Sequence, residues 1–160
     1  VLAIFDRMLG EGTKPNLVTF VGILNVCSHS GLIDMGLSYI EAMKNEYGLT
    51  PTLEHHTCIV DILGRAGQID KAVRVMKRMP SYPNIVLWLT ILGACKKWGN
   101  VELGSHAFEQ ALLLDEKETS AYVSMYNISI DFSIQANAEE VEAMRLTGIK
   151  TEAPNMLFVD

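Results

Sequence analysis

The chain has 160 residues, of which 49% are hydrophobic, and a formal net charge of −6. A chain of this size can bury a sizeable core, and no apolar run reaches the roughly 18 residues that a membrane-spanning helix needs. The acidic balance argues against a non-specific nucleic-acid binder, although residues 65–97 carry seven basic and one acidic side chain between two acidic flanks.

The first predicted element is a helix already under way in "VLAIFDRM", so we expect a piece of a longer protein without its targeting segment. Three helical hairpins follow, each with an apolar-periodic stretch, a glycine and a second such stretch: Gly22–Met43, His56–Met76 and Leu89–Ala111. Next, "AYVSMYNISI" predicts a helix, "DFSIQANAEE" an irregular stretch and "EEVEAMRL" a shorter helix. The final "TGIKTEAPNMLFVD" is expected to be extended, with a strand-like end.

The hairpins share features at fixed spacing. The glycines after the first helices, Gly31, Gly67 and Gly99, lie 36 and then 32 residues apart. Each is followed three residues later by an acid and then by a small residue: Asp34 and Gly36, Asp70 and Ala72, Glu102 and Gly104. Pro-Asn or Pro-Thr pairs begin at Pro15, Pro51 and Pro83. A helix–turn–helix period in the thirties marks an α-solenoid.

Each shared feature has a physical role. Glycine permits a left-handed helix end, the acid suits the positive start of the next helix, and the small residue lets paired helices approach. The prolines are expected to end the second helix of each unit. We predict an all-α, right-handed solenoid of antiparallel helix pairs with a short extended C-terminal segment, because each apolar stripe needs a neighbour. The single domain comprises a truncated repeat, three units and a degenerate unit, over residues 1–16, 17–52, 53–84, 85–118 and 119–160.

The amino-acid sequence of the repeats is specific enough to compare with a known family. Residues 14–80, "KPNLVTFVGILNVCSHSGLIDMGLSYIEAMKNEYGLTPTLEHHTCIVDILGRAGQIDKAVRVMKRMP", resemble the last long and short repeats of plant PLS-class pentatricopeptide repeat proteins. "PNIVLWLTILGACKKWGNVELG" resembles the E1 motif that follows them. Residues 119–160 are similar to a degraded E2 motif, in which "PNMLFVD" stands where the family has Pro-Gly-Cys-Ser-Trp-Ile-Glu.

The resemblance implies a concrete function. Such proteins act in plant mitochondria or chloroplasts, where their repeats bind single-stranded RNA at one nucleotide per unit, and most mark cytidines for C-to-U editing. Their E-type motifs resemble tetratricopeptide repeats and position a deaminase. This enzyme is either a C-terminal DYW domain or a separate protein recruited in trans.

By the family's scheme, the fifth and last residues of a unit read a base. These pairs are Val21 with Thr52 and Thr57 with Asn84, and the second pair implies adenine; the alternative is a helix-start polar group and a turn residue. Val18 fits the position that sandwiches a base, whereas Glu54 at the equivalent place disfavours tight binding. Leu89 removes the reading group from the E1-like unit.

The thirteenth residue of each unit is typically basic and approaches phosphate. Here these residues are His29, Arg65 and Lys97, and the alternative for the last two is an exposed charge favoured by the helix dipole. The basic residues Lys71, Arg74, Lys77 and Arg78 are interpreted as a solvated outer helix face. For protein contact the candidates are Trp98, since interfaces favour tryptophan, and Leu157 and Phe158 in a docking segment.

The sequence carries no catalytic motif. A zinc deaminase needs His-x-Glu and Pro-Cys-x-x-Cys, and "HAFE" at His106–Glu109 has the wrong spacing. The adjacent His55 and His56 point about 100° apart on a helix and are read as a polar and packing pair. Cys27, Cys58 and Cys95 are expected to be reduced core thiols. We therefore predict no enzyme, catalytic residue, cofactor or metal.

Three functions stay open. The first is an organellar RNA-binding protein, in the mitochondrial matrix or chloroplast stroma, that specifies an editing site and recruits editing factors or a cytidine deaminase. The second is a structural repeat subunit or scaffold of a larger organellar assembly such as a ribosome, with idle base-reading positions. The third, a tetratricopeptide-type chaperone adaptor, is disfavoured by the Pro-Asn boundaries.

Overall fold

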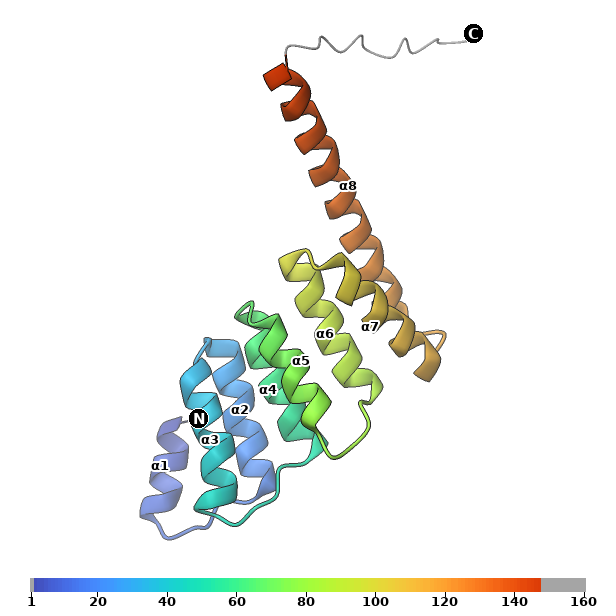
Figure 1. Ribbon diagram of the computed structural model, residues 1–160. Helices are drawn as coiled ribbons and strands as arrows, with labels where there is room; N and C mark the ends of the chain where they lie inside the picture. Colours follow the sequence, from blue (N-terminus) through green and yellow to red (C-terminus); the bar gives the residue numbers. More distant parts are fainter. Residues whose placement is uncertain (1, 148–160) are drawn as a thin grey trace.

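The computed structural model describes residues 2–147, and every regular element in this range is an α-helix. The eight helices in this range are α1 (Leu2–Gly10), α2 (Leu17–Ser30), α3 (Ile33–Asn45), α4 (Leu53–Arg65), α5 (Ile69–Arg78), α6 (Ile85–Trp98), α7 (Val101–Leu114) and α8 (Thr119–Thr147). They follow one another as a row of helix pairs, from which α8 projects (Figure 1). The predicted extended segment and its strand-like end lie outside the described residues.

The helices pair as the repeat pattern predicts. Helix α2 packs with α3, α4 with α5, and α6 with α7. The first helices of these pairs, α2, α4 and α6, also pack in series against one another, and α8 packs against α6 and α7. The predicted all-α solenoid is therefore confirmed for the described residues.

Glycine turns join the helices within each pair. Gly31, Gly67 and Gly99 have φ angles of 69°, 75° and 69°, the left-handed conformation that glycine adopts without steric cost. The acidic residues three positions later lie in the first turn of α3, α5 and α7, where they face the positive end of the helix dipole. Both features confirm the sequence prediction.

The small residues serve two contacts at once. A Cβ atom added to Gly36 would lie 3.4 Å from Cβ of Cys27 on the paired helix and only 2.6 Å from Cδ1 of Ile62 in the next unit. At Gly104 the same construction gives 3.0 Å to Cδ1 of Ile128. At Gly36 and Gly104, the helix that begins the next unit thus approaches even more closely than the paired helix of the same unit.

The prediction that the prolines end the second helices is wrong. Helix α3 already ends at Asn45, well before Pro51. Helix α5 ends at Arg78, because Met79 has the extended conformation (φ −65°, ψ 143°) that the following Pro80 favours. Pro15, Pro51 and Pro83 instead stand one residue before the N-caps of α2, α4 and α6, where they shape the entry into each first helix.

The predicted interruption in "DFSIQANAEE" is also wrong, because α8 is one continuous helix over Thr119–Thr147. Ser133 occupies the place that corresponds to Gly31, Gly67 and Gly99, and it donates its hydroxyl hydrogen to the carbonyl of Ser129 at 2.8 Å. Gln135 is joined to Glu139 by a hydrogen bond one turn along. The range holds no glycine or proline, so nothing in the backbone stops the helix.

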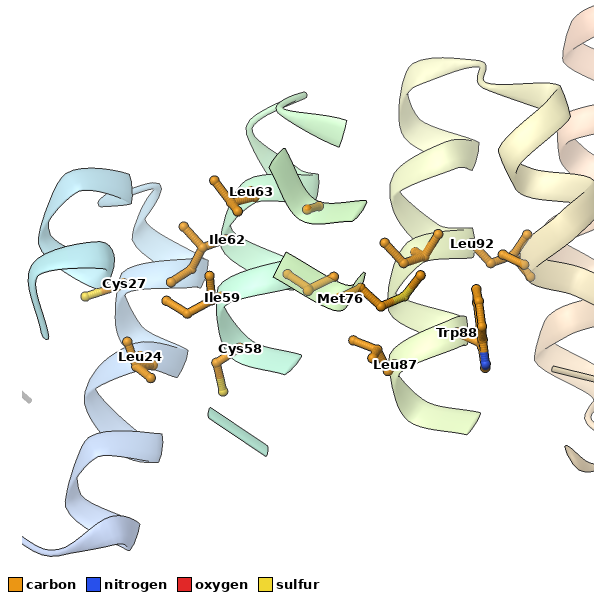
Figure 2. Close-up of a cluster of buried hydrophobic side chains, with 14 of the residues drawn as sticks. Leu24, Cys27, Cys58, Ile59, Ile62, Leu63, Met76, Leu87, Trp88 and Leu92 are labelled. Carbon is orange, nitrogen blue, oxygen red and sulfur yellow. The ribbon is translucent and has the colours of Figure 1, made fainter. Parts of the chain in front are cut away.

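The core runs continuously between the first helices. Side chains such as Leu24 on α2, Ile62 on α4 and Leu87 on α6 are buried in one row that crosses all three helices (Figure 2). The cysteines Cys27, Cys58 and Cys95 are buried free thiols, as predicted. Burial raises the pKa of Cys58 and of Cys95 to about 11, which keeps both thiols protonated and unreactive at neutral pH. Leu87, Trp88, Ile91 and Leu92 are buried as well, so this face of α6 belongs to the core.

Candidate nucleic-acid interface

The three first helices begin in the same way, and this sets a common register. Asn16, Thr52 and Asn84 are their N-cap residues, each with extended backbone. Equivalent positions therefore recur along the row of helices. The second, fifth, ninth and thirteenth helical residues fall on one face by helical periodicity. These are Val18, Val21, Asn25 and His29 on α2; Glu54, Thr57, Asp61 and Arg65 on α4; and Val86, Leu89, Gly93 and Lys97 on α6.

All four predicted base-reading residues line one groove. Val21, Thr52, Thr57 and Asn84 border a hollow of about 580 Å³, together with Asn25, Leu53, Glu54, Cys58 and Val86. We call this hollow the reading groove. It joins residues from three units that lie up to 65 positions apart in the sequence. The predicted sandwich residue Val18 is 78% exposed on α2 and does not line the groove itself.

Thr57 and Asn84 have their hydrogen-bonding roles fixed by the helices that carry them. The Thr57 hydroxyl donates to the Leu53 carbonyl at 2.9 Å, which leaves its oxygen as an acceptor. The Asn84 side-chain oxygen accepts from the Leu87 N–H at 3.0 Å as an N-cap, which leaves its NH₂ group as a donor. The pair can thus offer one acceptor and one donor to a ligand in the groove.

Val21 and Thr52 offer less. Val21 has no polar atom in its side chain. The Thr52 hydroxyl lies 2.7 Å from Nδ1 of His55, and the Thr52 N–H donates to the same nitrogen at 3.2 Å. The Nδ1 atom of His55 is therefore an acceptor, and the Thr52 hydroxyl donates to it as the Thr52 N–H does. This half of the groove therefore has little polarity left for a ligand.

His55 is a structural link between units. Its Nε2 lies 2.9 Å from the Leu17 carbonyl at the start of α2, so Nε2 carries the proton and Nδ1 accepts from Thr52. Burial lowers the pKa of His55, which favours this neutral form. The neighbouring His56 ring bonds the Thr52 carbonyl at 2.8 Å. The two histidines therefore act as the polar and packing pair that the sequence predicted.

The three predicted phosphate residues line a second hollow. His29, Arg65 and Lys97 border a space of about 400 Å³ at the C-terminal ends of α2, α4 and α6, with Ser28, Ile62 and Ala66. We call it the helix-end hollow. It brings together three side chains from three units, and its open sides leave all three exposed.

Asp61, which sequence reasoning missed, moderates the positive charge beside this hollow. Its carboxylate accepts hydrogen bonds from the Ser28 hydroxyl on α2 and from Nε of Arg65, the latter at 2.9 Å. Lys97 donates to the Arg65 carbonyl at 2.7 Å. Asp61 pairs with Arg65 and not with Lys97, so Lys97 supplies the positive charge of the helix-end hollow.

Trp98, the predicted protein contact, is 50% exposed and also packs within the array. Its indole N–H donates to the Gly64 carbonyl at 2.8 Å, and its ring lies against Gly67. The Lys97 ammonium stands 5.1 Å from the ring centroid, in cation–π distance. Trp98 thus joins two units and still leaves half of its surface exposed. Leu157 and Phe158 lie outside the described residues.

Asn25 and Val86 are among the residues of the reading groove that were not found from the sequence. Val86 holds the same helical position as Val18 and Glu54, so the repeat register alone could have indicated it. Asn25 is set by a contact between units, since its side-chain oxygen accepts from the Cys58 thiol at 3.3 Å. No pattern within one unit signals that contact.

Among residues 2–147 no helix is long and apolar enough to cross a membrane. In the same range no three His, Cys, Asp or Glu side chains gather where they could hold a metal ion. The basic residues Lys71, Arg74, Lys77 and Arg78 are all exposed on α5, outside both hollows.

The fold and these hollows define an α-solenoid repeat protein whose first helices present equivalent side chains along a groove. A family model described as the pentacotripeptide-repeat region of PRORP matches residues 1–87. The chain belongs to the pentatricopeptide repeat family.

Plant relatives support the same assignment. The mitochondrial pentatricopeptide repeat-containing protein At2g03880 of Arabidopsis thaliana is 40% identical over 152 residues, which are 94% of this chain and 24% of the relative. Another from the same plant, At3g14330, is 40% identical over 154 residues, 96% of this chain and 22% of the relative. The chain spans about a quarter of the length of these curated relatives.

Solved structures share the fold. A crystal structure of the pentatricopeptide repeat protein PPR10 in complex with an 18-nt psaJ RNA element matches with a TM-score of 0.71 at 18% identity, over 91% of this chain and 22% of that one. A crystal structure of PPR10 from maize matches with a TM-score of 0.65 at 21% identity, over 92% of this chain and 22% of that one. All these names denote pentatricopeptide repeat proteins.

Proposed function

We propose that this chain binds single-stranded RNA along its first helices, with one base in the reading groove and the backbone near the helix-end hollow. One observation carries the proposal: side chains selected from the sequence as base-reading or phosphate-binding, from three separate units, line two hollows on the same three helices. Binding of an RNA element by PPR10, which shares the fold, supports it.

Thr57 and Asn84 are the residues proposed to read a base. Adenine offers an amino donor beside a ring-nitrogen acceptor. The Thr57 oxygen can accept from the amino group while the Asn84 NH₂ donates to the ring nitrogen. Cytosine presents the same order of groups, so size and stacking must favour adenine over cytosine. Glu54 in the same groove adds a further acceptor and repels phosphate.

The backbone contact is proposed to be weak. Lys97 and Arg65 face the helix-end hollow, but Asp61 holds Arg65 in an ion pair whose Nε–Oδ2 distance is 2.9 Å. Affinity of this part of the protein is therefore expected to depend modestly on salt, since few phosphates are neutralised.

The test is an in vitro selection of random single-stranded RNA on the full-length protein, followed by affinity measurements on the selected sequence. The double variant Thr57→Val with Asn84→Ala should flatten the preference at one position, at a cost of about 1–3 kcal/mol in discrimination. Unchanged affinity and base preference would contradict the reading role.

A matched control variant separates reading from helix stability. Thr90 donates its hydroxyl to the Val86 carbonyl at 2.8 Å, and Asn100 caps α7 by accepting from the Leu103 N–H at 3.1 Å. Thr90→Val with Asn100→Ala therefore removes the same local hydrogen bonds outside the reading groove. It should leave RNA preference unchanged.

The finer function proposed is specification of a C-to-U editing site in a plant organelle, with recruitment of editing factors or a trans-acting deaminase by the E-type motifs of residues 85–160. The resemblance to PLS-class proteins supports it. The mitochondrion is favoured over the chloroplast because relatives such as At2g03880 and At3g02330 are named mitochondrial. Sequencing of organellar transcripts in a plant that lacks the protein should show the loss of editing at one cytidine.

The second candidate is a structural repeat subunit of a larger organellar assembly. Glu54 in the reading groove, the Asp61–Arg65 ion pair and the half-exposed Trp98 favour it. Under this reading the protein would co-sediment with a large complex, the random-RNA selection would enrich nothing, and organellar editing would be intact in its absence.

A further inference from the structure

A second groove lies between the second helices α5 and α7. It consists of two adjoining hollows of about 530 and 500 Å³, which share Lys77 and His106. One hollow runs along Val73 and Arg74 of α5, and the other ends over Trp88. We call it the outer groove. None of its lining residues belongs to the reading groove or the helix-end hollow.

One end of the outer groove is an apolar pocket. Trp88 forms its floor and meets the His106 ring edge-on, with the ring centroids 5.6 Å apart. Met76 and Met79 line it, and methionine adapts its shape to varied partners. Tyr82 stands at the rim with 96% of its surface exposed. A pocket with this lining suits a large apolar or aromatic side chain.

The middle of the outer groove is basic. Helix α5 carries four basic residues against the single acid Asp70, whereas α3 and α7 each carry more acidic than basic residues. Arg74 and Lys77 line the groove directly beside the apolar pocket, and Asp70 and Glu102 line its far end. Positive charge is thus placed at one point of the groove rather than along its whole length.

We propose that the outer groove binds an acidic peptide segment of another protein, which seats one apolar or aromatic side chain over Trp88 and carboxylates at Arg74 and Lys77. The complementary charge and the adjoining pocket together define this ligand. A nucleic-acid strand fits less well, because its regular phosphates would also meet Asp70 and Glu102. This inference does not depend on RNA binding by the first helices.

The test is a selection of random 12-residue peptides, displayed on phage, on the immobilised protein. Selected peptides should combine Asp or Glu with Leu, Met, Phe or Trp. One of them, made synthetically with a fluorescent label, is then titrated by anisotropy. Arg74→Glu with Lys77→Glu should weaken its binding about tenfold or more, as expected when steering and contact charges are reversed. Tyr82→Ser, at a fully accessible site, should weaken it about threefold.

Lys71→Glu with Arg78→Glu is the matched control. It makes the same charge change on the same helix at exposed residues that do not line the outer groove, so binding should change less than about twofold. The proposal is overturned if no peptide is selected, if the selected peptides lack acidic residues, or if both charge reversals weaken binding equally. Displacement of the peptide by a uridine oligonucleotide would also overturn it, since the outer groove would then belong to nucleic acid.

Discussion

Helix α8 and the first helices α2, α4 and α6 share one register but differ in what covers them. At the eighth helical position, Leu24, Val60 and Leu92 are fully buried, whereas the equivalent Tyr126 on α8 is 68% exposed. At the tenth position Ile62, Ala94 and Ile128 are all buried. The side chains of α8 that meet α6 and α7 are thus buried, while those on its other face are exposed to solvent.

The difference shows that burial in this fold is decided by the neighbouring unit. Tyr126, Val123, Ile130 and Ile134 are as apolar as many core residues of α2 and α6, and yet they are exposed. In a solenoid each unit contacts only its neighbours, so stability is a sum of local units and interfaces. Equivalent substitutions should therefore have unequal effects in the array and on α8.

The largest effect is expected from the pair Leu92→Ala and Tyr126→Ala, at the same helical position. Leu92→Ala leaves a cavity between buried helices and should lower the free energy of unfolding by about 2–5 kcal/mol. Tyr126→Ala should change it by less than about 0.5 kcal/mol, because the side chain is largely in water. Urea unfolding followed by circular dichroism measures both. Equal losses would show that α8 is covered as the other helices are.

A smaller effect is expected where two first helices touch. A Cβ atom at Gly64 would lie 2.8 Å from Cβ of Ala94, so Gly64→Val should force α4 and α6 apart and cost about 1–3 kcal/mol. Gly93→Val is the control, since nothing lies within 4 Å of a Cβ atom there. Thermal unfolding of the two variants compares them. A Gly64→Val protein as stable as Gly93→Val would contradict the close contact between units.

The smallest effect concerns pH and separates α4 from α8. His55 links α4 to Leu17, whereas the equivalent residue of α8 is the apolar Ala121. Because burial lowers the pKa of His55, the unfolded chain binds a proton more readily than the folded one. Stability should therefore fall as the pH drops below the ordinary histidine pKa of about 6.5.

Unfolding free energies between pH 7.5 and about 5 test this dependence. His55→Asn should be less stable at neutral pH and show a flatter decline toward acid. His29→Gln, an exposed histidine, controls for the loss of a histidine as such. If the decline has the same slope in His55→Asn as in the parent protein, His55 is not its source.

The sequence was sufficient for features that repeat within one unit. Gly31, Gly67 and Gly99 predicted the turns, because a left-handed helix end favours glycine. The resemblance to the family then indicated Val21, Thr57 and Arg65 as residues of one face. Contacts between units were not predictable in this way. Asp61 meets Ser28 across 33 positions, and neither residue is unusual within its own helix.

The prediction of a break within α8 was wrong for another reason. The stretch around Ser133 lacks clear apolar periodicity, which suggested a break, but a break needs a residue that stops the helix. Ser133 bonds back to its own helix instead. Weak amphipathicity indicates an uncovered helix as readily as an absent one, and α8 is the uncovered case.

The most direct test of RNA binding along the first helices uses the burial of the native thiols. Cys27, Cys58 and Cys95 are buried, so within residues 1–160 a maleimide should react selectively with one introduced exposed cysteine. Val86→Cys places it in the reading groove and Ser81→Cys in the outer groove. Saturating amounts of the selected RNA should slow labelling of Val86→Cys severalfold and leave Ser81→Cys unchanged. Equal rates with and without RNA at Val86→Cys, or protection of Ser81→Cys alone, would contradict the account.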